Sequence, residues 1–183
     1  MKTLPFEEFK AEILSRAKAV NACESQYKRA IKAGNIEDLL TVIKDNFSYC
    51  VREKIIDIEL LSQVDSESLE SAEIYLNKSS DKGYILADSG NITASGSAIV
   101  RAYNSVVVRA LDSAEVWAND SAKVRAYNSV VVRAYNSAEV LAYGRVVVRA
   151  SDNVEVRAFD SAVVSATGSV EASAWGNAVI TRI

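Results

Sequence analysis

The second half of the chain repeats one eight-residue phrase, approximately S-A-x-V-x-A-x-N/D, from Ser89 to the C-terminus without an insertion. Residues 97–104 form one such octad, and residues 105–112 follow as the next. A repeat this short cannot enclose a hydrophobic core alone, so successive repeats must stack on one another. The repeat therefore predicts a solenoid.

Each octad combines a short strand pattern with a turn pattern. Positions 2, 4 and 6 hold small apolar residues and alternate with polar, charged or aromatic residues at positions 3, 5 and 7. This alternation is typical of a strand with one buried face. Position 8 is Asn, Asp or Gly, residues that tolerate the left-handed backbone conformation of a tight turn. The solenoid is therefore expected to be a β-helix.

Arginine at position 5 indicates how many octads form one coil. Taking every third octad gives two arginine series and a third series that contains Trp117 and Leu141 instead. This separation predicts a three-sided β-helix with about 24 residues per coil. A recent duplication of a three-octad block would leave the same pattern whatever the coil length, so that alternative stays open.

Stacked strands lie about 4.8 Å apart, so equivalent side chains should form ladders on the outer faces. Arginine and tyrosine ladders can contact phosphates and stack on bases. They can equally be a solvated surface whose arginine stems cover the sheet. The candidate binding ladders comprise Arg101, Arg125, Arg149, Arg109, Arg133, Arg157, Tyr103, Tyr127 and Tyr135.

The third face is the candidate protein interface, because aromatic residues often anchor such surfaces. Its residues are Trp117, Leu141, Tyr143, Glu115 and Glu139.

A further expectation concerns the last coil, where unpaired strand edges favour association. We expect a homodimer formed through the C-terminal coils, with Ala172, Trp175, Ile180 and Ile183 at the candidate dimer end.

Residues 1–64 predict a small helical bundle. Phe6, Phe9 and Ile13 recur at helical spacing, and Asn35 is a suitable N-cap with Asp38 three residues later. Residues 65–88 read as a linker, with a polar hinge at 65–71 followed by degenerate first strands. The predicted fold class is therefore α+β, with a helical domain at 1–64 and an octapeptide-repeat β-solenoid at 89–183.

Composition argues against an enzyme. The chain has no histidine, and its seven glycines stand singly rather than in a phosphate-binding loop. We expect no catalytic residue, metal site or cofactor. The net charge of −3 resembles neither a DNA mimic nor a strongly basic nucleic-acid clamp.

Cysteine usage and hydropathy predict a cytoplasmic protein with no membrane contact. Cys23 and Cys50 fall within helical apolar patterns, which favours buried free thiols over a disulfide. No secretory leader is recognisable, and no apolar stretch approaches the roughly 18 residues of a membrane span.

The tandem S-V-V-V-R-A-Y-N phrase resembles bacterial and phage proteins built from S-A-T-V-R-A-Y-D-type octads. Some members of that group carry a short helical N-terminal segment with an Ala-Cys pair, which Ala22-Cys23 matches. Position 3 departs from the family threonine, so the surface chemistry of the family is not carried over. The resemblance implies no activity, although its phage associations favour interference with a host protein.

Together these observations predict a non-enzymatic protein-binding or scaffold solenoid. The favoured biological setting is a phage or mobile-element protein that inhibits a host defence factor, with the partner unidentified. The alternative is binding of an anion, nucleotide or nucleic acid through the arginine and tyrosine ladders.

Overall fold

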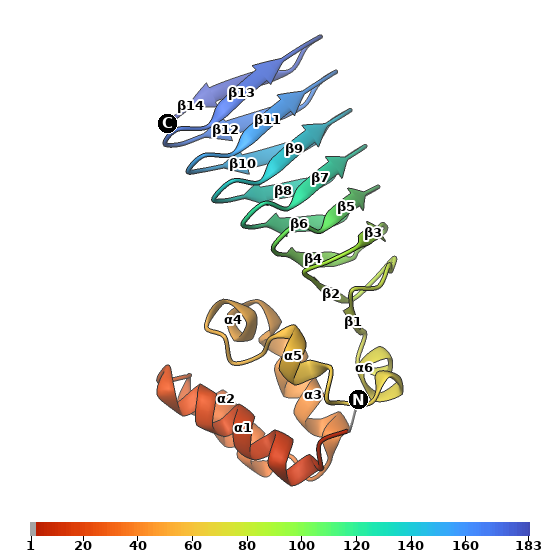
Figure 1. Cartoon of the computed structure of the whole chain (residues 1–183), viewed down its shortest axis with the longest axis vertical. Helices are drawn as coiled ribbons and strands as arrows, with labels where there is room; N and C mark the ends of the chain where they lie inside the picture. The colour runs from red at the N-terminus through yellow and green to blue at the C-terminus, as the bar shows by residue number, and fades with distance from the viewer. Residues whose placement is uncertain (1–2) are drawn as a thin grey trace. The chain divides into compact units, whose positions relative to one another are not determined.

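The computed structural model describes residues 3–183, which divide into two compact units. The helical unit ends at Leu76, and the solenoid runs from Asn77 to Ile183 (Figure 1). A helical region followed by a β-solenoid confirms the predicted fold class at this level. The segment 65–88 is shared between the units, since the first strand belongs to the helical unit and the next to the solenoid.

The helical unit packs six helices around an apolar core that includes Phe9, Leu39 and Phe47. The helices are α1 (Phe6–Ala19), α2 (Glu24–Lys32), α3 (Ile36–Asp45), α4 (Phe47–Arg52), α5 (Ile58–Leu61) and α6 (Ser66–Ser71), and strand β1 (Ile74–Leu76) follows. The Asn35 cap is confirmed, because its side chain accepts a 2.8 Å hydrogen bond from the Asp38 amide. The predicted hinge is wrong, since Asp65 caps α6 in the same way.

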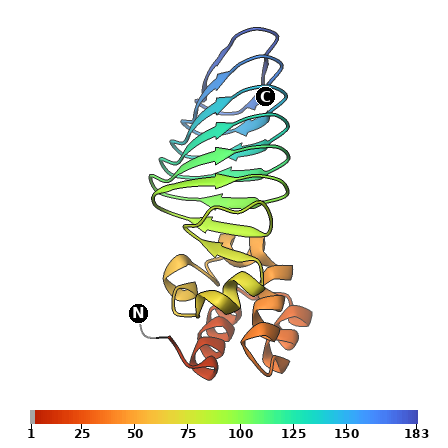
Figure 2. The ribbon, with the colours of Figure 1, turned by 90° about the vertical axis from the view of Figure 1, so that its right-hand side faces the viewer.

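Short parallel strands make up the solenoid and form two sheets (Figures 1 and 2). Sheet A contains β2 (Tyr84–Ala87), β4 (Ile99–Ala102), β6 (Glu115–Ala118), β8 (Val131–Ala134), β10 (Val147–Ala150), β12 (Val163–Ala166) and β14 (Val179–Arg182). Sheet B contains β3 (Asn91–Ala94), β5 (Val107–Ala110), β7 (Lys123–Ala126), β9 (Glu139–Ala142), β11 (Glu155–Ala158) and β13 (Glu171–Ala174).

The three-sided coil predicted from position 5 is wrong. Val132 pairs with Val116 on one side and Val148 on the other, so each octad stacks on the second octad along the chain. One coil has about 16 residues and two sides, and the solenoid makes about six turns. The interior explains this difference, because alanine and valine fill a thin slab between two sheets. A triangular coil would enclose a wider space than such small side chains can fill at protein packing density.

The turns between strands contain residues in the left-handed backbone conformation, as position 8 of the octad predicts. Position 8 has a positive φ, for example 53° at Asn104, 60° at Asp112 and 83° at Gly144. Side chains at these turns also link successive coils. Asp112 accepts hydrogen bonds from the Gly96 amide and from the Asn128 side chain, each at 3.4 Å.

Candidate functional site on the outward faces of the solenoid

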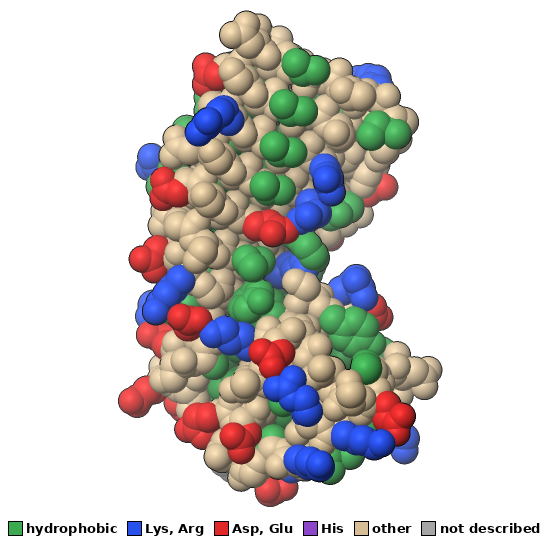
Figure 3. Space-filling view, turned by 180° about the vertical axis from the view of Figure 1, so that it is seen from behind, with side chains coloured by type: hydrophobic (Ala, Val, Ile, Leu, Met, Phe, Trp, Pro, Cys, Tyr) green, Lys and Arg blue, Asp and Glu red, His purple; other side chains and the backbone are tan. Residues whose placement is uncertain are grey.

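The outward face of sheet A carries a column of exposed valines at position 3. Val131, Val147, Val163 and Val179 lie in register on four adjacent strands, and we call them the valine column. Exposure rises along it, from 38% at Val147 to 43% at Val163 and 53% at Val179. Figure 3 shows the corresponding row of hydrophobic side chains along the solenoid.

Position 3 of sheet B has the opposite character. Its successive residues from β5 to β13 are Val107, Lys123, Glu139, Glu155 and Glu171. From β7 to β13 the position 3 column of sheet B is therefore charged, whereas from β8 to β14 the same column of sheet A is apolar.

Side chains on β4, β6 and β8 of sheet A form a cluster around Trp117. The Trp117 indole lies between the guanidinium groups of Arg101 and Arg133, and the latter is 5.0 Å from the ring centroid. Glu115 accepts a 2.7 Å hydrogen bond from Trp117 Nε1 and pairs with Arg133. Arg149 follows on the next strand, and no carboxylate among residues 3–183 lies within ion-pair distance of it. Positive charge thus remains available beside the valine column.

The predicted arginine ladders are regrouped by the shorter coil. Sheet A carries Arg101, Arg133 and Arg149, and sheet B carries Arg109, Arg125 and Arg157. Tyr103 and Tyr135 follow strands of sheet A, whereas Tyr127 follows a strand of sheet B. The single-face ladders inferred from every third octad are therefore wrong, and binding by these residues stays a prediction.

The predicted protein interface is also divided. Glu115 and Trp117 lie on sheet A, Glu139 and Leu141 lie on sheet B, and Tyr143 follows β9 at the solenoid edge. These five side chains do not form one surface, because the octads that carry them belong to opposite sheets.

Sequence reasoning missed a stack of aromatic rings at the edge that follows sheet B. The aromatic stack comprises Tyr127, Tyr143, Phe159 and Trp175, with successive ring centroids 5.2, 4.8 and 4.8 Å apart. The ring planes differ by only 8° to 11°, so the rings repeat with the strands. Its signal in the sequence was an aromatic residue at position 7 of every second octad.

The predicted dimer end lies on the last two strands and the turns after them. Ala172 and Ile180 are half-buried, whereas Trp175 is 48% and Ile183 83% exposed. Arg182 occupies the inward position that Ala166 holds on the neighbouring strand, and it donates a 3.1 Å hydrogen bond to the Val170 carbonyl. An inward charge on an edge strand opposes further stacking. Dimerisation through this end stays a prediction.

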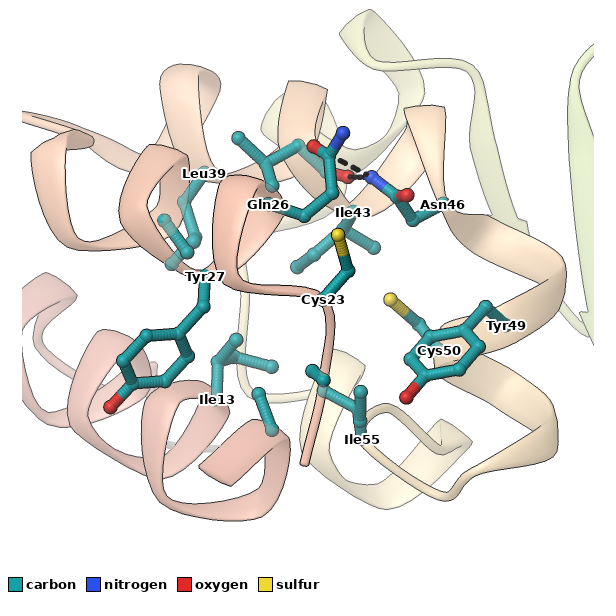
Figure 4. A pocket seen from close by; sticks show the side chains of 14 residues that line it. Ile13, Cys23, Gln26, Tyr27, Leu39, Ile43, Asn46, Tyr49, Cys50 and Ile55 are labelled. Carbon is teal, nitrogen blue, oxygen red and sulfur yellow. Dashed lines mark hydrogen bonds between the residues drawn. The ribbon is translucent and has the colours of Figure 1, made fainter. Parts of the chain in front are cut away.

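The helical unit contains an apolar pocket of about 260 Å³ between α1, α2, α3 and α4 (Figure 4). Small side chains such as Ala17 and Ala30 line one part, and the Asn46 side chain donates a 3.3 Å hydrogen bond to Gln26 beside it. Both cysteines line this pocket.

The two thiols are free, as the sequence predicts, but they differ in environment. Cys23 is exposed, which contradicts the expectation that it is buried, because it precedes α2 as its N-cap. A 3.2 Å contact between its sulfur and the Ser25 hydroxyl lowers its pKa. Cys50 is buried, and desolvation raises its pKa to about 11.

Metal sites and membrane spans are both absent from residues 3–183. No three Cys, Asp or Glu side chains there are grouped closely enough to hold a metal ion. Within the same described range, no helix has both the length and the hydrophobicity that crossing a membrane requires.

No protein-family model matches the chain, and no curated protein or solved structure matches it either.

Proposed function

We propose that this protein is a non-enzymatic binding module that holds a protein partner on the outward face of sheet A. The observation that carries the proposal is the valine column, whose members are increasingly exposed along four adjacent strands. β-branched side chains in register form a flat, rigid apolar strip, and ordering such a strip on binding costs little side-chain entropy. Contiguous exposed apolar surface of this kind marks interaction sites.

The charge beside the strip defines the chemistry of the partner. Arg149 lies on the same strand and the same face as Val147, two residues further along. It has no carboxylate within ion-pair distance among residues 3–183, whereas Arg133 is held by Glu115. A protein surface with an apolar strip flanked by carboxylates therefore complements this face.

The proposal is tested by substituting the strip without disturbing the interior. Val147→Lys with Val163→Lys places two like charges on exposed register partners, so we expect the unfolding free energy to fall by no more than about 1 kcal/mol. The matched control is Glu155→Lys with Glu171→Lys, at the same octad position on sheet B. The assay is affinity capture from host lysate, followed by a binding titration of the purified captured protein.

We expect a saturable complex that the sheet A variant weakens by at least about tenfold and the sheet B control leaves within about twofold. Equal loss in both variants, or no saturable partner, would overturn the proposal. Inhibition of a host factor by a phage or mobile-element protein remains the favoured biological setting, and it rests on the sequence resemblance.

A further inference from the structure

Two arginines on sheet B have no ion-pair partner among residues 3–183, unlike the other cations of that sheet. Arg109 and Arg125 are direct register partners on β5 and β7, so their backbones lie about 4.8 Å apart. Neither has a carboxylate within ion-pair distance among residues 3–183. By contrast, Arg157 pairs with Glu155 at 2.7 Å and Lys123 with Glu139 at 2.9 Å.

The acidic groups on the next strand, β9, and in the turn after β5 are already engaged. Both carboxylate oxygens of Glu139 contact the Lys123 ammonium group, at 2.9 and 3.1 Å. Asp112, just beyond β5, accepts hydrogen bonds from the turns of the coils on either side. The next register partner of Arg125 is Leu141, which is uncharged. The repulsion between the two guanidinium groups is therefore not offset by a neighbouring carboxylate.

The pair borders a shallow, largely polar hollow of about 340 Å³. Asn91, Thr93 and Tyr127 line it together with the two arginines. Thr93 is the register partner of Arg109 on the other side, so hydroxyl and guanidinium groups follow one another along the column. The Arg109 guanidinium lies 5.5 Å from the Tyr127 ring centroid, which places it at the rim of the hollow.

We infer that this hollow binds a phosphate group, as the free anion or as a phosphate monoester. The guanidinium groups of two register partners offer several N–H donors and two positive charges at one hollow, which suits a phosphate dianion. The Thr93 hydroxyl and the Asn91 amide add neutral donors at the same place. The site lies on sheet B, away from the valine column, so it extends beyond the proposed protein-binding function.

The test is a titration of the full chain at low, constant ionic strength. Inorganic phosphate and O-phosphoserine are the two ligand arms, with sodium chloride as the blank. A single-stranded oligonucleotide without terminal phosphates is titrated as a competing ligand class. Binding is followed by calorimetry and by the side-chain Nε–Hε NMR signals of the arginines. The variants are Arg109→Gln, Arg125→Gln and their combination. Arg157→Gln is the matched control, because Arg157 occupies the same octad position on the same sheet.

We expect saturation below about 10 mM, a loss of roughly tenfold in each single variant, and no measurable binding in the double variant. Arg157→Gln should change the affinity by less than about twofold. Equal affinities for the two ligands would identify free phosphate as sufficient, and a preference for phosphoserine would identify an esterified phosphate as the source. Either result supports the inference.

Three outcomes would overturn it: no saturable binding of either ligand, equal weakening by Arg157→Gln, or binding only of a single-stranded oligonucleotide without terminal phosphates. The last result would favour a phosphodiester chain and the nucleic-acid alternative. Val147→Lys with Val163→Lys should leave phosphate binding unchanged, which separates failure of this inference from failure of the proposed function.

Discussion

Removal of the Tyr143 ring should destabilise the solenoid much more than removal of the Tyr135 ring. Both are tyrosines at position 7 of an octad, so the sequence alone gives no reason for a difference. In the structure, Tyr143 is stacked between Tyr127 and Phe159, with centroid distances of 5.2 and 4.8 Å. Tyr135 lies at the other edge, and the octads stacked on its own carry Asn119 and Ser151 at the equivalent position.

The expected magnitude follows from these contacts. One stacked aromatic pair contributes about 0.5–1.5 kcal/mol beyond the burial of apolar area, and Tyr143 has two such pairs. Truncating a fully buried aromatic ring costs roughly 3–5 kcal/mol. Tyr143 is half-buried, so a part of that cost adds to the loss of the two stacked pairs. Tyr143→Ala should therefore lower the unfolding free energy by about 2–4 kcal/mol. Tyr135 is 37% exposed and has no stacked ring partner among residues 3–183, so Tyr135→Ala should cost about 1 kcal/mol or less.

Urea denaturation followed by tryptophan fluorescence is the appropriate assay. Both tryptophans, Trp117 and Trp175, belong to the solenoid, so the signal reports on that unit. A double-mutant cycle between Tyr143 and Phe159 should give a coupling energy of about 0.5–1.5 kcal/mol. The same cycle between Tyr135 and Phe159 should give none.

The comparison also separates the two coil lengths. In a three-octad coil, Tyr135 would lie beside Leu111 and Phe159, whereas Tyr143 would lie beside Asn119 and Thr167. A larger effect at Tyr135, or coupling between Tyr135 and Phe159, would refute the two-sided arrangement together with the surface assignments that depend on it.

Three further predictions concern single residues. Gly144→Ala should destabilise the solenoid by about 1–3 kcal/mol in the same urea assay, because φ is 83° there and a Cβ atom would lie 3.3 Å from the Asn128 backbone. A disulfide reagent at neutral pH should modify Cys23 within minutes and Cys50 only after denaturant is added, since one thiol is exposed and the other buried; equal rates would contradict this. Stability should fall between pH 9 and 11, because Cys50 loses its proton near 9.0 when unfolded but near 11 when folded. This loss of about 2–3 kcal/mol should be absent from Cys50→Ala.

Local structure was predictable from the sequence because each local signal has one physical meaning. Alternating positions 2, 4 and 6 mark an inward-facing strand side, and Asn, Asp or Gly at position 8 marks a left-handed turn. The Asn35 cap is equally local and was predicted correctly. The break between α3 and α4 was not predicted, because the apolar face of the two helices continues across Asn46.

The predicted coil length of 24 residues was wrong because the residues at position 5 do not indicate which strands stack on one another. Arg101 and Arg133 flank Trp117, and the other arginines at position 5 are solvent-exposed. Nothing therefore requires one arginine to stack on another, and the observed order includes Trp117 and Leu141. From Lys123 onwards, position 3 separates at two octads, with valines in one series and charged residues in the other. Position 7 does the same, since only one series is aromatic from Tyr127 to Trp175. Side chains that touch their neighbours in the next coil constrain one another chemically. The octad spacing at which such positions carry similar side chains therefore indicates the length of one coil.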